Sequence, residues 1–351
     1  MQSLAVSLLC AFSCLASMTS GYKLVHNYDH TNWFTSFIYE DAADPTNGNV
    51  NYVSLADAQK LGLTKVIGNQ VYMGVDNTTV LSDKVNGKRN SIWVESVHEF
   101  THGILIGDFA HMPGSDCGTW PGFWTIRNGD GPYGEMDILE GSNDITQAFI
   151  SLHTENACSF NSPKSAELGT LNNGNTDCKL SNGAGCSVES TANSYGTPFN
   201  KNGGGIYAMQ WTSNFIRVWF FARSKIPADI TAGTPDPTKW GTPTANFDSA
   251  DGGCDIDANF PAQTVYFDTT FCGAGAGGQA WSDWSDCPAK TGYSTCQEYV
   301  AKVPTPSMTH IGLSTRSRST NRLDNSFSSS SSLFVCIHLR LHHIYRATLQ
   351  L

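Results

Sequence analysis

Short apolar and aromatic runs, repeatedly divided by turn-forming residues, constrain the fold of this chain more than any other feature. Turn signals such as Asn47-Gly48 and Asn86-Gly87 separate them, and convincing helical periodicity is rare. Many short strands at close spacing predict an all-β protein, most simply a β-sandwich. The 33 glycines and a charged fraction of only 15% fit the same class. The runs are 34–38, 50–55, 103–109, 136–139, 215–221 and 264–271.

The charge balance limits the partners of the chain. Its 351 residues carry a formal net charge of -10, and 40% of them are hydrophobic. Phosphate backbones are bound by basic faces, so the composition argues against nucleic acid as a partner. It allows a packed core and a neutral substrate such as a polysaccharide.

Residues 1–20 have the pattern of a secretory signal peptide. The stretch 4–16 is an unbroken run of apolar and small residues with small residues after it, although no Lys or Arg precedes it. The alternative is a membrane anchor, but a bilayer span needs about 20 apolar residues. We therefore predict secretion, to the extracellular space or cell wall, with no membrane partner.

Cysteine usage agrees with export. Of eleven cysteines, Cys10 and Cys14 fall in the predicted signal peptide and Cys336 in a divergent tail. The remaining even number predicts a disulfide framework, but eight cysteines allow about 105 pairings and all of them stay open. They are Cys117, Cys158, Cys178, Cys186, Cys254, Cys272, Cys287 and Cys296. Asn77-Thr78-Thr79 is a glycosylation sequon.

Two stretches differ in composition from the rest. Residues 169–205 are rich in Asn, Gly, Ser and Thr and hold Cys178 and Cys186, which predicts a long stapled loop. From Pro304 onward Asp324 is the only acid, Arg and His become frequent, and 328–332 is a run of serine. We interpret 21–303 as one catalytic domain and 304–351 as a basic, Ser-rich tail that does not continue the fold.

The segment His98-Glu99-Phe100-Thr101-His102 matches the H-E-x-x-H signature of zinc proteases. On a helix the two histidines would share one face and could bind zinc. Gly103 and the strand-like residues after it argue against a helix. Along a strand the histidines would lie roughly 13 Å apart, too far for one metal ion. We interpret the motif as a chance match.

Three acids lie close together at 134–141, in the order Gly-Glu-Met-Asp-Ile-Leu-Glu-Gly. In a strand, Glu135 and Asp137 would point to one face, but strict alternation would bury Glu140, which is costly for an unpaired carboxylate. A β-bulge near Ile138 and Leu139 would return Glu140 to the face of the other two. The segment therefore predicts three carboxylates on one face of one bulged strand.

Such a cluster has a chemical use. Retaining glycosidases need two carboxyl groups about 5–5.5 Å apart, one as nucleophile and one as acid/base. For these residues alone, a solvated acidic strand edge or a calcium site is the alternative. Trp120 and Trp124 lie just upstream. Because aromatic faces stack on sugar rings, they favour a carbohydrate substrate, although either could instead pack in the core.

The segment 134–141 resembles the signature of glycoside hydrolase family 16 in its bulged form, E-x-D-x-x-E. Further segments resemble the fungal laminarinase-like branch, in order, over about residues 21 to 303. They are 44–46, 87–91, 111–113, 117–124, 152–154, 193–196, 202–205 and 215–221. The resemblance implies a concanavalin-like jelly-roll β-sandwich with an open cleft on its concave face. It also implies endo-cleavage of β-1,3 or mixed β-1,3/1,4 glucan.

The same resemblance implies roles for individual residues. Glu135 would be the nucleophile, Glu140 the acid/base and Asp137 the assisting acid. Trp124 would stack near the point of cleavage. His153 would lie beside the reactive centre, although a histidine satisfied in the core is the alternative. The substrate-binding residues that we expect are Trp120, Trp124, His153, Gln210 and Trp211.

Some positions depart from the pattern of the branch. Gly131 and Gly275 stand where it usually has Trp, and Gln210 where it usually has Glu. Two missing stacking platforms put affinity and glucan preference in question, not the chemistry. The branch also closes with a strand rich in Trp, Ile and Val, which nothing after Pro304 resembles. An error in the gene model or a divergent extension would explain the tail.

The sequence therefore predicts a monomeric, secreted, retaining endo-1,3(4)-β-glucanase that acts on β-glucan polysaccharide. A β-glucan transglycosylase would use the same acids. A lectin-like glucan-binding protein would keep the fold without turnover, but the presence of both Glu135 and Glu140 disfavours it. No cofactor is predicted; a structural calcium ion is compatible with the sequence but not indicated by it.

Overall fold

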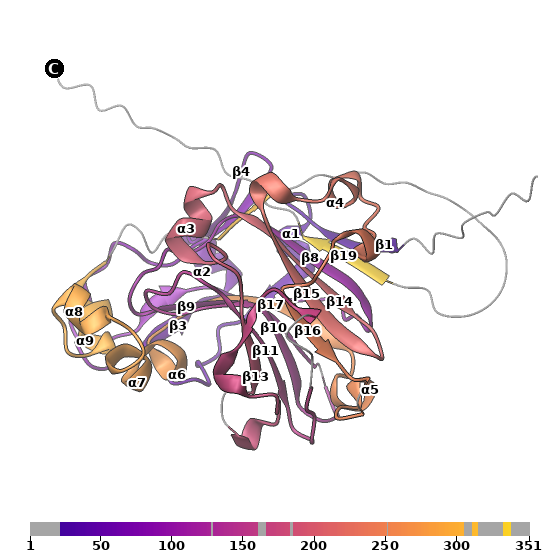
Figure 1. Cartoon of the computed structure of the whole chain (residues 1–351). Helices are drawn as coiled ribbons and strands as arrows, with labels where there is room; N and C mark the ends of the chain where they lie inside the picture. The colour runs from indigo at the N-terminus through magenta and orange to yellow at the C-terminus, as the bar shows by residue number, and fades with distance from the viewer. Residues whose placement is uncertain are drawn as a thin grey trace, which may run out of the picture.

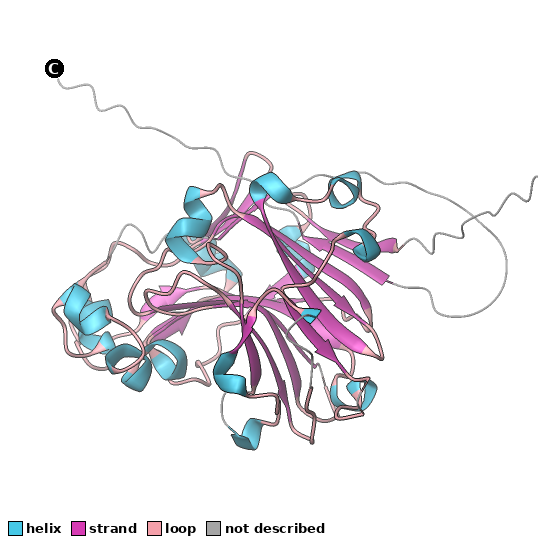
Figure 2. Cartoon of the chain, in the orientation of Figure 1, coloured by secondary structure: helices cyan, strands magenta, loops and turns pink. Residues whose placement is uncertain are grey.

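In the computed structural model, the strands form two large, mostly antiparallel sheets that face each other as a sandwich, with short helices around them (Figures 1 and 2). The structure describes residues 22–127, 129–160, 166–182, 185–250, 252–304, 311–314 and 333–337. The predicted signal peptide lies outside this part. No helix of the described part is long and apolar enough to cross a membrane.

One sheet has nine strands within the described part of the chain. Its central strand β8 pairs with β14 on one side and with β18 and β19 on the other. In spatial order its strands are β16 (Ala245–Asp248), β15 (Phe215–Ala222), β14 (Gly205–Trp211), β8 (Gly103–His111), β18 (Ile311–Ser314), β5 (Gln70–Met73) and β4 (Thr64–Ile67), with β19 (Leu333–Ile337) between β8 and β1 (Lys23–Tyr28).

The second sheet has eight strands in the described residues, and it carries the acidic segment on β10. In order they are β12 (Thr170–Leu171), β13 (Cys186–Glu189), β11 (Phe149–Thr154), β10 (Gly134–Glu140), β9 (Thr119–Arg127), β17 (Gln263–Phe271), β7 (Trp93–Ser96) and β2 (Phe37–Tyr39). A small parallel pair, β3 (Val50–Tyr52) and β6 (Arg89–Ser91), lies apart from the two sheets.

Strand β9 shows how the sequence separates the core from an open face. Its residues alternate between buried and partly exposed from Thr119 to Ile126, as the period of two of a strand requires. Phe123 points into the core, where it stacks on Phe267 at 4.8 Å and meets Phe109 of the opposite sheet at 5.3 Å. The other face carries Trp120 and Trp124.

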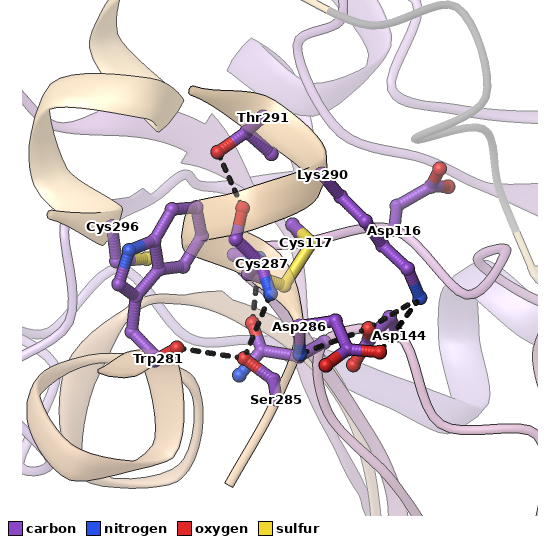
Figure 3. The surroundings of a disulfide bond; sticks show 12 residues. Asp116, Cys117, Asp144, Trp281, Ser285, Asp286, Cys287, Lys290, Thr291 and Cys296 are labelled. Atoms are coloured by element: carbon purple, nitrogen blue, oxygen red, sulfur yellow. Dashed lines mark hydrogen bonds and ion pairs between the residues drawn. A yellow bond between two sulfur atoms is a disulfide. The ribbon is translucent and has the colours of Figure 1, made fainter. Parts of the chain in front are cut away.

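The helices are short, and four of them gather at one end of the sandwich (Figure 1). Disulfides tie this group to the sheet: Cys117–Cys287 joins α8 to the residues before β9, and Cys272–Cys296 joins α9 to the end of β17. Figure 3 shows Lys290 reaching Asp144 beside the first bridge, at 2.6 Å. The helices are α1 (Trp33–Ser36), α2 (Leu55–Lys60), α3 (Gly196–Lys201), α4 (Ala228–Ala232), α5 (Ile256–Asn259), α6 (Gly273–Ala276), α7 (Gly278–Ser282), α8 (Cys287–Thr291) and α9 (Cys296–Lys302).

The predicted disulfide framework is confirmed within the described residues. All eight cysteines of the matching region are paired, and Cys336 is not needed. The two remaining bridges are Cys158–Cys254 and Cys178–Cys186.

Three expectations from the sequence need correction. The run 34–38 is not all strand, because Trp33 and Phe37, four residues apart, both turn toward the core and stack at 4.0 Å around α1. The segment 169–205 is not only a loop, since β13 pairs with β11 in the second sheet. The tail continues the fold at two strands, since β18 pairs with β5 and β8, and β19 pairs with β8. An unpaired strand edge offers main-chain donors and acceptors, so almost any sequence can pair with it. The rest of the tail lies outside the described residues.

Candidate active site

The acidic strand β10 carries the bulge that the sequence predicts. Asp137 lies opposite Trp124 of β9, and the next paired residue is Leu139, opposite Phe123, so Ile138 is the extra residue. The pairing with β11 shifts at the same place. As a result Glu135 and Glu140 are partly exposed, Asp137 is only 6% exposed, and Ile138 is fully buried in the core.

A cleft of about 560 Å³ lies over this strand and its neighbours. Its walls come from the alternate residues of β9, β10 and β17 that face away from the core. The structure brings four of the predicted site residues, Trp120, Trp124, Glu135 and Glu140, to this cleft. The other lining residues are Asp44, Pro45, Thr46, Tyr52, Trp93, Gly122, Ile126, Arg127, Tyr133, Tyr266, Asp268 and Thr270.

Each glutamate is held by an aromatic donor. The hydroxyl of Tyr133 donates to Oε2 of Glu135. The indole N–H of Trp120 donates to Oε1 of Glu140 at 2.7 Å. Burial, followed by the charge of Asp137, raises the pKa of Glu135 to about 8 and that of Glu140 to about 7. At mildly acidic pH the cluster therefore holds protons that isolated carboxylates would have lost.

His153 and Asp137 form an ion pair below the two glutamates. The imidazole Nε2 lies 3.1 Å from Oδ2 of Asp137, and His153 is paired with Glu135 across β10 and β11. Burial opposes the charged imidazole, but Asp137 and the two glutamates outweigh it and raise the pKa of His153 to about 9. Gly185 leaves room for the ring, since a Cβ there would come 2.5 Å from Nδ1 of His153.

Three of these side chains also lie close enough together to hold a metal ion. Glu135, Asp137 and His153 each offer one ligand atom within 4.8 Å of the others. In the structure the Nε2 atom of His153 lies 3.1 Å from Oδ2 of Asp137, as an ion pair.

The structure contradicts the expectation that Gln210 and Trp211 contact substrate. Both lie on β14, in the sheet opposite the cleft. Trp211 is fully buried against Phe100, with ring centroids 5.6 Å apart, and the amide of Gln210 donates to the hydroxyl of Tyr22 at 2.6 Å. Alternation along a strand identifies its two faces but not the sheet to which it belongs.

The zinc-protease signature does not assemble a metal site. His98 stacks on His26 at 4.4 Å, whereas Nε2 of His102 lies 2.8 Å from Oδ1 of Asp257, which accepts its hydrogen bond. His102 also has a positive φ of 58°, which is not helical. The segment is therefore not the helix that the zinc motif requires, as the sequence predicts.

The two glycines that replace Trp differ in their surroundings. Gly131 has a φ of +126°, a conformation that other residues rarely adopt, so a Trp there would need a different backbone. At Gly275 a Cβ would lie 2.4 Å from Cδ2 of Trp120. Gly275 therefore lets α6 pack directly against the indole that holds Glu140.

Sequence reasoning missed several residues of the cleft. Asp268 of β17 accepts a hydrogen bond from the indole of Trp124 at 2.9 Å, and Tyr266 stacks on the same indole at 4.6 Å. Burial raises the pKa of Asp268 to about 6. A usable signal was present, since Tyr266, Asp268 and Thr270 are polar at every second position of one strand. Tyr133 left no comparable signal.

A family model matches most of the chain, including every strand of the cleft. The family model for the XgeA-like, catalytic GH16 domain covers residues 37–307. The chain belongs to glycoside hydrolase family 16. The resemblance inferred from the segment 134–141 is thereby confirmed.

Two curated relatives of this family 16 chain come from the fungi Aspergillus niger and Schizosaccharomyces pombe. It is 44% identical over 304 residues to a probable endo-1,3(4)-β-glucanase of Aspergillus niger, a match that covers 85% of this chain and 40% of that protein. It is 40% identical over 286 residues to a probable glycosidase of Schizosaccharomyces pombe, covering 81% and 65%. The chain therefore spans only about half of the length of the curated relatives that it matches.

Two solved structures of the family align with this chain over nearly their whole length. Laminarinase 16A from Phanerochaete chrysosporium, with β-glucans in its donor and acceptor sites, is 37% identical and has a TM-score of 0.74, covering 83% of this chain and 97% of that one. An elongating family 16 β-1,3-glucosyltransferase is 40% identical with a TM-score of 0.72, covering 81% and 95%. The predicted jelly-roll β-sandwich is confirmed.

Proposed function

We propose that this chain cleaves internal β-1,3 linkages of β-glucan, including mixed β-1,3/1,4 glucan, with retention of configuration. The observation that supports the proposal is the bulge at Ile138, with Glu135 and Glu140 lining one cleft and Asp137 buried between them on the same strand. A retaining mechanism needs two carboxyl groups on either side of one bond. The glucanase names of the relatives support the choice of substrate.

In the proposed reaction, the carboxyl group of Glu140 donates its proton to the glycosidic oxygen while the carboxylate of Glu135 attacks the anomeric carbon. The bond from that carbon to the leaving oxygen breaks, and a covalent glycosyl-enzyme forms. Glu140, now a carboxylate, takes a proton from a water molecule that attacks the same carbon. The released sugar keeps its configuration because the carbon is inverted twice.

The neighbours of the two glutamates suit these roles. Burial keeps a proton on Glu140 up to about pH 7, as a general acid requires. Burial and the charge of Asp137 raise the pKa of Glu135 to about 8, so the two glutamates share protons near neutral pH, and attack requires Glu135 to be the ionised member of the pair. The hydrogen bond from Tyr133 and the positive charge of His153 oppose that rise and favour the ionised form of Glu135. Asp137, paired with His153, would assist by holding that charge in place.

Substitution of Glu135 tests the proposal. Glu135→Gln keeps the shape of the side chain and removes the nucleophile, so hydrolysis of laminarin should fall by at least about 10³-fold while the fold remains intact. Glu99→Gln is the matched control, because Glu99 is exposed and would be the essential base of a zinc protease. Near-normal turnover by a folded Glu135→Gln protein, or loss of activity in Glu99→Gln, would refute the assignment.

Transfer of the glycosyl group to another sugar is the second candidate, because the chain is 40% identical to a family 16 β-1,3-glucosyltransferase. The two reactions share the covalent intermediate and differ in whether water or a sugar hydroxyl attacks it. Product analysis of laminari-oligosaccharides, lichenan and cellulose separates them. Products longer than the substrate would indicate transfer, and only shorter ones hydrolysis.

We further propose that the protein is secreted and works as a monomer on extracellular or cell-wall glucan. The four disulfides support an oxidising compartment. Asn77, in the partly exposed turn after β5, is our candidate for glycosylation. The acidic net charge of -10 disfavours nucleic acid as a partner. The catalytic domain would comprise 21–303 together with β18 and β19.

A further inference from the structure

Asp268 is a further acid of the cleft, on strand β17, which lies outside the segment 134–141. Its Oδ1 accepts the indole N–H of Trp124 at 2.9 Å. Its Oδ2 accepts the hydroxyls of Thr270 at 3.1 Å and Tyr52 at 3.2 Å. These donors satisfy a carboxylate that is partly exposed at the cleft floor, so its position and orientation are fixed.

Gly122 of β9 lies between Asp268 and Glu140. It is paired with Asp268 on one side and with Glu140 on the other. A Cβ at this position would come 2.9 Å from Cδ1 of Trp124 and 3.1 Å from Oδ1 of Asp268. Glycine therefore leaves the space in which the indole edge reaches the carboxylate, and no side chain stands between the two acids.

Trp124 is consequently held on two sides. Tyr266 stacks on one face of its indole, with the ring planes 20° apart, and Asp268 holds its N–H edge. The indole lines the cleft, so a sugar ring can stack only where this clamp leaves a face open. If the indole were free to change rotamer, ordering it would cost side-chain entropy each time a sugar binds.

Asp268 also belongs to the electrostatic surroundings of the proposed acid/base. Burial and the charge of Asp137 raise the pKa of Glu140 most, and the charge of Asp268 adds to them. The other titratable groups that face Glu140 are Glu135 of β10, His153 of β11 and Tyr195 before α3. Asp268 itself faces Tyr52 of β3 and Asp44 in the loop before that strand.

We propose that Asp268 is a positioning residue that fixes Trp124 as a sugar platform and, through its negative charge across Gly122, helps to keep the proton on Glu140. This inference rests on the proposed glucanase function. It assigns two separable effects to one side chain, one carried by the hydrogen bond to the indole and one by the charge.

Two substitutions separate these effects. Asp268→Asn keeps an oxygen for the indole but removes the charge, so the alkaline limb of the kcat/KM profile should move to lower pH. A unit charge two strand spacings away, about 10 Å, shifts a pKa by about 0.6–1.2 at an effective dielectric constant of about 20–40. Asp268→Leu should show the same shift and, in addition, a KM about tenfold higher, since no acceptor holds Trp124.

Asp248→Asn is the control for the loss of one negative charge, because Asp248 lies on β16 of the opposite sheet; it should leave the profile unchanged. A readout that needs no turnover is the tryptophan fluorescence. It should change near pH 6 as Asp268 takes a proton, and this step should vanish in Asp268→Asn and in Trp124→Phe.

These experiments separate failure of the role proposed for Asp268 from failure of the proposed glucanase function. If Glu135→Gln is inactive but Asp268→Asn keeps the wild-type alkaline limb and fluorescence step, the glucanase assignment stands and the role of Asp268 is refuted. If the fluorescence step is lost in Asp268→Asn while Glu135→Gln stays active, the contact between Asp268 and Trp124 is supported and the glucanase assignment fails. A folded Asp268→Leu protein with unchanged KM would refute the platform.

Discussion

Replacement of Gly275 by alanine should reduce the catalytic activity that depends on Glu140, although residue 275 acts on Glu140 only through Trp120. In the structure, a Cβ at Gly275 would lie 2.4, 2.5 and 2.7 Å from three carbons of the Trp120 indole. Carbon atoms in contact are normally about 3.5–4.0 Å apart, so the ring or α6 must move by about 1 Å. The indole N–H now lies 2.7 Å from Oε1 of Glu140, and a shift of this size would break that hydrogen bond.

The size of the effect follows from the type of bond lost. A hydrogen bond to a charged group contributes about 1.5–3 kcal/mol, and each 1.36 kcal/mol corresponds to a tenfold change in rate. We therefore expect kcat on laminarin to fall about 10- to 100-fold in Gly275→Ala. The N–H of Trp120 also lowers the pKa of Glu140, so its loss should move the alkaline limb to higher pH, opposite to the shift expected for Asp268→Asn.

The assay needs two comparisons. Ala274→Ser adds one atom to the exposed neighbour in α6 and should leave kcat unchanged. Trp120→Phe removes the N–H directly. If Gly275 acts through Trp120, the double variant should be no slower than the slower single variant. Wild-type kcat and pH profile in Gly275→Ala, or additive losses in the double variant, would refute this reasoning.

Two further predictions concern stability. The pKa values of His153, Glu135 and Glu140 are raised to about 9, 8 and 7, from 6.5 for the histidine and 4.5 for the glutamates. Because raised values mean that the folded state binds protons more tightly, the stability from these groups is complete below about pH 4.5 and is lost as pH rises through about 7–9. The melting temperature should fall over this range, and less so in Glu140→Gln; an equal fall in both proteins would contradict the assigned protonation. Removal of Cys158–Cys254, which spans 96 residues, should lower the free energy of unfolding by about 5 kcal/mol, against about 2.5 kcal/mol for Cys178–Cys186, which spans 8. Denaturant titration of the two double Cys→Ser variants would test the order, and the reverse order would show that native contacts outweigh loop entropy.

The features that could be predicted from the sequence depend on neighbours along the chain. The bulge follows from six residues, because only an extra residue keeps Glu140 out of the core. The cleft face of β9 follows from strict alternation, which places Trp120 and Trp124 on one side. The same reasoning rejects the zinc motif, since Gly103 begins a strand directly after it.

The features that could not be predicted depend on pairing between distant segments. Asp268 meets Trp124 only because β17 pairs with β9, across 144 residues of sequence. The expected roles of Gln210 and Trp211 were wrong for the same reason: β14 has the right alternation but lies in the other sheet. The short helices α6 to α9 have too few turns for periodicity, and disulfides tie α8 and α9 to the sheet. Strands β18 and β19 pair through main-chain groups, which leave little trace in the side chains.

The hydrogen-bond donors in the cleft explain why Gly275 matters for Trp120. Indole is a donor only, so a tryptophan can hold a carboxylate by its edge and still present apolar carbon to a sugar ring. Trp120 does this for Glu140 and Trp124 for Asp268. Binding and acid–base chemistry then share the same side chains, and a shift of either ring should change KM and kcat together. Such rings need empty space beside them, which Gly122 and Gly275 supply. A Trp at position 275, as the branch usually has, would occupy the place of the Trp120 ring. The glycine there is therefore a condition for the hydrogen bond to Glu140 in this chain, rather than only the loss of a sugar platform.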